Sequence, residues 1–214
     1  MKILKFTNTS EPITAPITKF GGQPTWIAEP QWPLSRSTSK PMRFICQIAL
    51  PKSITTTEQQ MAYIFMTELA VDDTDFVDGT WEPDGGENAV ILQPHAFEPT
   101  CETSSNQTGP TIQIQMNGPQ NFLDRILKKS KTWWADVELM VNETEIDEDE
   151  CFHSTLLQEP VWLQYDETPS DGLWSCIAQI DSGESEFYVN FGDGGIGYAF
   201  VRNDGLAANF LWQC

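Results

Sequence analysis

The same short elements recur in the same order near the two ends of the chain, and this recurrence constrains the fold more than any other feature of the sequence. Each copy has a Pro-x-Trp element, then an apolar segment with Gln before Ile, then Tyr-x-Phe. The elements are residues 23–27, 44–48 and 63–65 in the first copy and 159–163, 176–180 and 198–200 in the second. We therefore expect repeats at 19–67 and 157–201, which form two similar β-rich halves around a shared core within a single domain, 1–214.

Each copy also contains a segment that is apolar on both of its faces. In residues 44–50, alternation places Phe44, Cys46, Ile48 and Leu50 on one face, and residues 174–180 repeat the pattern. This is typical of central strands that are covered on both sides. Because a buried amide must satisfy its donors and its acceptor, we expect Gln47 and Gln179 to bond the backbone of a crossing loop.

The remaining elements favour the α+β class, with antiparallel or mixed sheets and few helices. Strands are predicted at 111–116, 133–141, 187–191 and 209–213. Helix is predicted over 120–131, where Phe122, Leu123, Ile126 and Leu127 form an apolar stripe, and a short second helix begins near residue 56.

The charge balance excludes several classes of partner. The chain has 12 basic and 31 acidic residues, a formal net charge of −19. A nucleic acid would be repelled, because phosphate neutralisation needs clustered Lys and Arg.

No apolar stretch has the length of a membrane span, and the first residues lack the apolar region of a secretion signal. We therefore expect a cytoplasmic protein that binds neither nucleic acid nor membrane.

The acidic residues gather in two segments that also contain aromatic residues. In the plainer interpretation they form a solvated face that maintains solubility. In the functional interpretation they form a docking surface for a cationic protein. A negative field speeds the association of a cationic protein with this surface, and aromatic residues anchor interfaces. The candidate partner-binding residues are Asp72, Asp73, Asp75, Asp78, Trp81, Asp147, Glu148, Asp149 and Glu150.

Nothing in the sequence points to a catalytic, metal or cofactor site. The glycines at 192, 194 and 197 match a dinucleotide-binding spacing, but a strand-like segment follows them where that site needs a helix. Cys151 and His153 form the one close Cys–His pair, and the acidic residues before them would raise a thiol pKa. We expect no catalytic residue, no metal and no cofactor.

Several of these segments resemble the YwqG-like family of uncharacterised bacterial proteins. The likeness rests on residues 19–24, 32–33 and 41–48 at the start, and on 160–164, 177–181 and 192–200 in the second half. A more distant likeness is to the carboxy-terminal domain of eukaryotic programmed-cell-death and ribosome-assembly proteins. Those relatives carry cysteine pairs where this chain has residues 202–205, so no metal function is transferred.

The resemblance implies a role without naming a catalytic residue. Relatives commonly occur among genes for polymorphic toxins and their neutralising partners, which implies an immunity protein. The acidic field agrees, since carboxylates can occupy the cationic site of a nuclease toxin. We expect a non-catalytic protein that occludes a cationic toxin. The alternatives are an enzyme with a Cys or carboxylate site and a chaperone for basic proteins; the oligomeric state is open.

Overall fold

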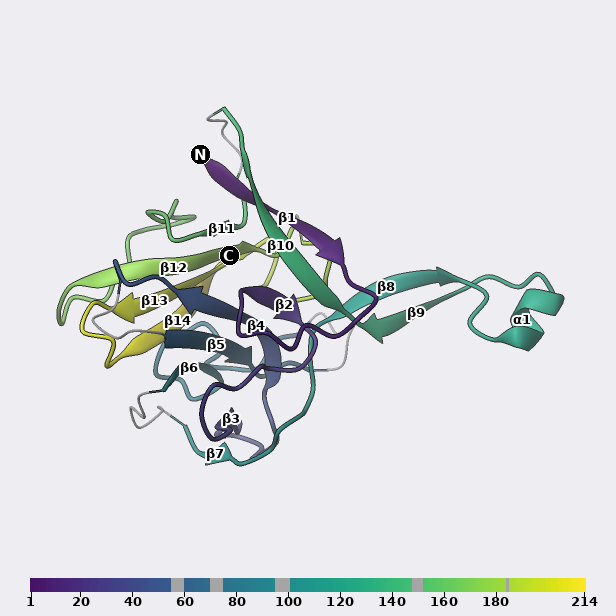
Figure 1. Cartoon of the computed structure of the whole chain (residues 1–214), viewed down its shortest axis with the longest axis horizontal. Helices are drawn as coiled ribbons and strands as arrows, with labels where there is room; N and C mark the ends of the chain where they lie inside the picture. The colour runs from purple at the N-terminus through teal and green to yellow at the C-terminus, as the bar shows by residue number, and fades with distance from the viewer. Residues whose placement is uncertain (55–59, 70–74, 95–100, 148–151, 184) are drawn as a thin grey trace.

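The main body of the protein consists of two antiparallel sheets (Figure 1). The computed structural model describes residues 1–54, 60–69, 75–94, 101–147, 152–183 and 185–214. The first sheet has the order β1 (Lys2–Asn8), β10 (Glu138–Glu145), β2 (Lys19–Gly21), β4 (Arg43–Leu50), β5 (Gln60–Met66), β6 (Asn88–Gln93). The second has the order β11 (Thr155–Leu156), β12 (Trp174–Asp181), β13 (Ile196–Arg202), β14 (Ala208–Gln213). The predicted β-rich fold with few helices is confirmed.

Four strands of the first sheet have counterparts in the second. The series β2-β4-β5-β6 corresponds to β11-β12-β13-β14, and both series are antiparallel throughout. The register agrees as well, because β2 places Lys19 opposite Gln47 and β11 places Thr155 opposite Gln179. The recurrence in the sequence therefore corresponds to a recurrence in topology.

A bulge in each copy changes the faces that simple alternation predicts. The register shifts between Phe44 and Cys46 in β4 and between Cys176 and Ala178 in β12. Phe44 consequently packs on the outer face of its sheet, while Cys46 joins the core between the sheets. The expectation that these two residues share a face was wrong, because an extra residue in one strand reverses the side chains beyond it.

The core between the two sheets is built from both halves. It contains Ile45 and Ile64 from the first sheet and Ile177 and Phe210 from the second, and β6 lies against β14. A separate cluster around Tyr63 covers the outer face of the first sheet, and one around Tyr198 covers the outer face of the second. Both central strands are thus buried on two sides, as expected.

Gln47 and Gln179, which were predicted to bond crossing loops, make equivalent hydrogen bonds to the loop backbone in the two halves. Gln47 donates from Nε2 to the carbonyl of Ile17 (2.8 Å) and accepts from the backbone N–H of Thr25 (2.7 Å). Gln179 donates to the carbonyl of His153 (2.8 Å) and accepts from the N–H of Val161 (2.8 Å). This prediction is confirmed in both copies.

Three of the other predicted elements differ from the structure. The strand expected at 133–141 is divided into β9 (Lys131–Asp136) and β10, and residues 187–191 lie in a loop. The helix is α1 (Phe122–Ile126), much shorter than the predicted 120–131. The second predicted helix, near residue 56, falls outside the described residues.

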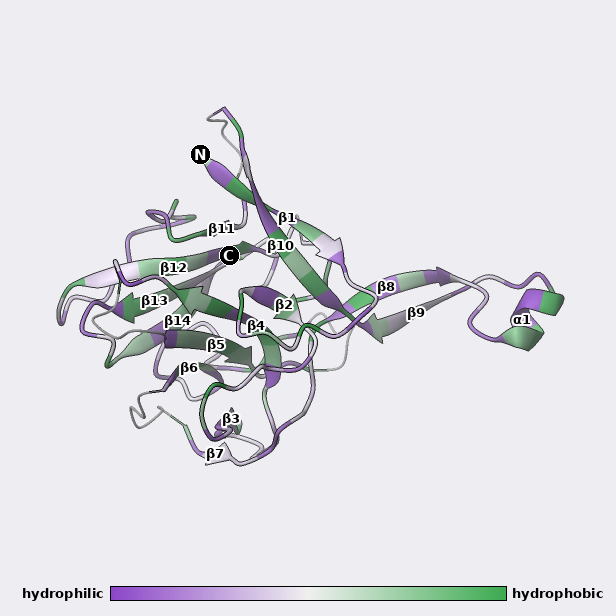
Figure 2. Cartoon of the chain, in the orientation of Figure 1, coloured by the Kyte–Doolittle hydropathy of each residue, from purple (hydrophilic) through white to green (hydrophobic). Residues whose placement is uncertain are grey.

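A hairpin arm extends from the body of the molecule (Figure 1). It consists of β8 (Gln113–Gly118) and β9, with α1 at its far end. A small pair, β3 (Trp32–Pro33) with β7 (Thr103–Ser104), completes the fold. The apolar stripe of α1 therefore does not pack on the core, and Figure 2 shows green hydrophobic residues at the end of the arm.

Candidate functional site

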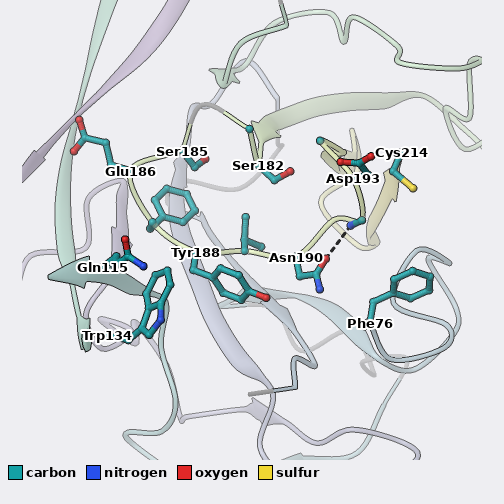
Figure 3. Close-up of a pocket in the computed structure, with 15 residues that line it drawn as sticks. Phe76, Gln115, Trp134, Ser182, Ser185, Glu186, Tyr188, Asn190, Asp193 and Cys214 are labelled. Carbon is teal, nitrogen blue, oxygen red and sulfur yellow. Dashed lines mark hydrogen bonds between the residues drawn. The ribbon is translucent and has the colours of Figure 1, made fainter. Parts of the chain in front are cut away.

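A groove of about 1050 Å³ lies at the base of the arm, beside the loop that joins β12 to β13. The arm contributes Gln115 and Trp134, the loop contributes most residues from Ser182 to Gly194, and Phe76 and Cys214 line it as well. Figure 3 shows Trp134 and Gln115 on one side, Asp193 and Cys214 on the other, and Tyr188 and Asn190 between them. The groove is thus formed by segments that are far apart in the sequence.

Aromatic side chains connect the groove to the core. Trp134 and Tyr188 meet edge to face, with ring centroids 5.4 Å apart. Phe76 packs in the same way on Trp81 (5.5 Å) and Trp212 (5.4 Å). Because aromatic pairs in this geometry are attractive and rigid, the apolar part of the groove is preformed.

Hydrogen bonds hold the loop in place. Asn190 accepts from the N–H of Gly192 (3.0 Å, dashed in Figure 3) and donates from Nδ2 to the carbonyl of Asp75 (3.0 Å). The N–H of Tyr188 donates to the carbonyl of Gln113 (2.7 Å), which ties the loop to the base of the arm. The loop therefore presents its side chains from a fixed backbone.

A buried ion pair supports this loop from below. Glu68 lies 2.6 Å from Arg43, its side chain is 3% exposed, and it accepts from the N–H of Asn190 (3.2 Å). Burial raises the pKa of Glu68 to about 7, although Arg43 and the Asn190 N–H act to lower it. The loop is thus hydrogen-bonded to a buried carboxyl group whose pKa is raised.

The groove carries negative charge and, in its described lining, no positive charge. Glu186 and Asp193 are exposed carboxylates, and neither forms a salt bridge with a residue that the structure describes. None of the 15 lining residues is Lys, Arg or His. Carboxylates beside aromatic faces suit a ligand group that is both cationic and planar or apolar, such as an arginine side chain.

The structure separates the acidic residues that the sequence singled out. Asp75 and Asp78 are exposed on the segment that brings Phe76 to the groove. Trp81 is half-buried against Trp212, so it supports Phe76 and is not an exposed anchor. Asp72 and Asp73 lie outside the described residues.

The second acidic segment lies at the opposite end of β10 from the groove. This strand begins beside the arm at Glu138 and ends at Glu145, about 24 Å away at the spacing of a β-strand. Asp147 is exposed just beyond that end, close to the amino terminus, because the N–H of Ile146 bonds the carbonyl of Met1. Glu148, Asp149 and Glu150 lie outside the described residues.

An acidic residue at the start of β10, Glu138, has a structural role. Glu138 lies 2.5 Å from the ammonium group of Lys19, whose side chain is 1% exposed. Lys19 also donates to the carbonyls of Ile13 (2.9 Å) and Gln23 (2.7 Å). The pair therefore anchors the amino-terminal loop and offers no free carboxylate to a partner.

Three of the described cysteines, Cys46, Cys101 and Cys176, do not have the properties of nucleophiles. Burial raises the pKa of Cys46, that of Cys101 to about 11 and that of Cys176 to about 12. Cys214 is exposed at the groove, and Cys151 lies outside the described residues.

Within the described ranges, no group of three or more His, Cys, Asp or Glu is placed to hold a metal ion. No helix there is long and apolar enough to cross a membrane.

Sequence reasoning missed Glu186, Asp193, Trp134 and Tyr188 as members of one site. Trp134 comes from the arm and the other three come from the loop before β13. The sequence predicted Trp134 and Tyr188 in two separate strands, 133–141 and 187–191, and placed Glu186 and Asp193 in neither. The usable signal was the glycine-rich segment 192–197, which marks an irregular loop between strands.

The duplicated sheets and the acidic groove define a β-rich protein with two related halves. The chain belongs to the family described as a domain of unknown function (DUF1963), whose model matches residues 18–214. No protein of curated function matches it significantly.

Proposed function

We propose that the protein is a non-catalytic binding protein that captures a basic segment of another protein in the groove between the arm and the β12–β13 loop. The observation that supports this most directly is the groove lining, which combines Trp134, Tyr188 and Phe76 with Glu186 and Asp193 and includes no basic side chain among its described residues. Aromatic and apolar contacts would supply affinity, and the carboxylates would select for positive charge.

The net charge of −19 supports the same choice of partner. A field of this size attracts cationic proteins over distances of about a Debye length, roughly 8 Å at physiological salt, and repels anionic ones. The acidic residues at the far end of β10 act in this long-range way, while those beside the groove make contact.

In its specific form the proposal is that the chain is a YwqG-like immunity protein, and that its partner is a cationic toxin domain whose active surface it covers. Steric occlusion needs no catalytic group. An immunity protein would bind one partner tightly, whereas a chaperone for basic proteins would bind many.

Binding of a fluorescent peptide of alternating arginine and leucine, followed by anisotropy, tests the groove directly. We expect the variant Glu186→Gln/Asp193→Asn to bind at least about tenfold more weakly than the wild type. Glu11→Gln/Glu102→Gln is the matched control, because it removes two exposed carboxylates elsewhere. Equal weakening in the two variants would show that only net charge matters, and the groove would be rejected.

Co-expression tests the immunity form. A basic toxin domain encoded beside this gene should stop bacterial growth alone and lose that effect when the wild-type protein is present. Rescue should fail with the groove variant and persist with the control. Rescue by the groove variant at wild-type level would reject the groove as the neutralising surface.

A further inference from the structure

The tip of the arm has the opposite charge from the rest of the molecule. Residues 118–132 contain four basic side chains, Arg125, Lys128, Lys129 and Lys131, and one carboxylate, Asp124, for a net charge of +3 in a chain of −19. Lys131 lies 3.4 Å from Asp124, which leaves the other three cations of the tip for external contacts. One third of all basic residues thus lie in this short segment.

The same tip exposes four large apolar side chains. Phe122 is 76% exposed, Leu123 67%, Ile126 60% and Leu127 57%. Asn121 caps α1 by accepting from the N–H of Asp124 (2.9 Å). An exposed apolar cluster of this kind marks an interaction site.

The groove at the base of the arm matches the tip in chemistry. The tip offers apolar side chains surrounded by cations, and the groove offers aromatic faces between the carboxylates Glu186 and Asp193. The tip cannot reach the groove of its own chain, since β8 and β9 hold it about 20 Å along an extended hairpin. A second copy of the chain removes this obstacle.

We propose that two copies of this protein form a symmetric dimer in which the tip of each arm occupies the groove of the other copy. When two arms pack side by side in opposite directions, the tip of each lies beside the base of the other, where Gln115 and Trp134 line the groove. A two-fold axis makes both contacts identical, as in most homodimers. Two such contacts and the paired arms bury the apolar residues that the monomer exposes.

This inference rests on the proposed function in one respect, since the same groove receives the tip and the basic partner. The dimer is then a stored form in which the partner site is covered. A cationic partner competes with the tip, and its binding separates the two copies.

Sedimentation velocity of the full chain between about 1 and 200 µM tests the dimer. We expect a monomer–dimer equilibrium in the wild type. The tip variant Arg125→Glu/Lys128→Glu/Lys129→Glu and the groove variant Glu186→Lys/Asp193→Lys should each be monomeric over this range. A control with the same charge change at exposed sites of the body, Lys5→Glu/Lys40→Glu/Lys52→Glu, should dimerise like the wild type.

Mixing the two charge-reversed variants gives the sharpest result. Each tip then meets a groove of opposite charge, so an equimolar mixture should form a heterodimer although neither variant dimerises alone. The variant Phe122→Ser/Ile126→Ser, which keeps every charge, should also be monomeric. Circular dichroism confirms folding, which these exposed substitutions leave intact.

Three results would overturn the dimer. They are a wild type that stays monomeric, a dimer that survives both charge reversals, and a monomer that binds phosphatidylglycerol vesicles through the tip. The arginine–leucine peptide separates this inference from the proposed function. If the wild type is monomeric and binds the peptide, the dimer is rejected and capture of a basic partner stands. If the wild type dimerises and the tip variant does not bind the peptide, capture of a basic partner is rejected and the dimer stands.

Discussion

Tyr63 and Tyr198 occupy equivalent positions in the two halves and make the same three contacts. Each hydroxyl donates to a carbonyl, that of Thr25 at 2.9 Å and that of Val161 at 3.0 Å. Each also accepts from an N–H two residues further on, at 3.1 and 2.9 Å. A tryptophan lies over each ring, with centroids 4.7 Å apart in the first half and 4.5 Å in the second.

Removing either hydroxyl should destabilise the protein by about 1–3 kcal/mol, because a partly buried loop N–H and a loop carbonyl each lose their hydrogen-bond partner. We expect Tyr63→Phe and Tyr198→Phe to lower the midpoint of urea unfolding by similar amounts. Tyr165→Phe is the control, since Tyr165 is 64% exposed. Unequal losses would mean that the two loops contribute differently in spite of equal geometry.

Ionisation of Glu68 should make folding stability depend on pH in a defined direction. Its folded pKa of about 7 exceeds the ordinary value of 4.5, so its stabilisation is full below pH 4.5 and is lost as pH rises through 7. Relative to Glu68→Gln, the wild type should lose about 3 kcal/mol between pH 4.5 and 8. Urea unfolding of both proteins measures this difference, and a constant difference would show that Glu68 has the same pKa in the folded and unfolded states.

Gly21 should not tolerate a side chain. Its φ of +64° favours glycine, and a Cβ there would lie 2.1 Å from the carbonyl oxygen of Val137. Gly21→Ala should therefore destabilise by more than about 2 kcal/mol. Gly194→Ala is the control: its φ is +67°, but no atom lies within 4 Å of the added methyl, so thermal unfolding should detect only the smaller backbone cost.

The acidic residues beyond β10 should affect the rate of capture more than its strength. Replacing Asp147, Glu148, Asp149 and Glu150 with amides should slow association with a cationic partner about two- to fivefold at low salt and leave dissociation unchanged. Stopped-flow kinetics at about 50 and 300 mM salt measures both rates. Faster dissociation would place these residues in the contact itself.

The sequence predicted the parts of the fold that depend on repeated local patterns. The elements with Trp26, Gln47 and Tyr63 and their second copies predicted two similar halves, and the loop-bonding role of both glutamines is confirmed. Alternation failed at the bulges after Phe44 and Cys176, since a bulge leaves no mark in hydrophobic periodicity.

The candidate site was predicted only in part. Asp75 and Asp78 border the groove segment, whereas Trp81 supports it from within and Asp147 lies at the far end of β10. The apolar stripe from Phe122 to Leu127 predicted a helix over residues 120–131. The structure places it at the end of the arm, because periodicity reports which side chains share a face and not what covers that face.

The sequence by itself determined the β-rich class, the duplication and the excess of negative charge, because these follow from composition and from contacts within each repeat. Only the tertiary structure decided that Trp134 and Glu186 line one groove and that the basic residues stand apart at the tip of an arm. The physical reason is that a groove and a projecting arm depend on how distant segments pack, and neither local propensity nor charge counts contain that arrangement.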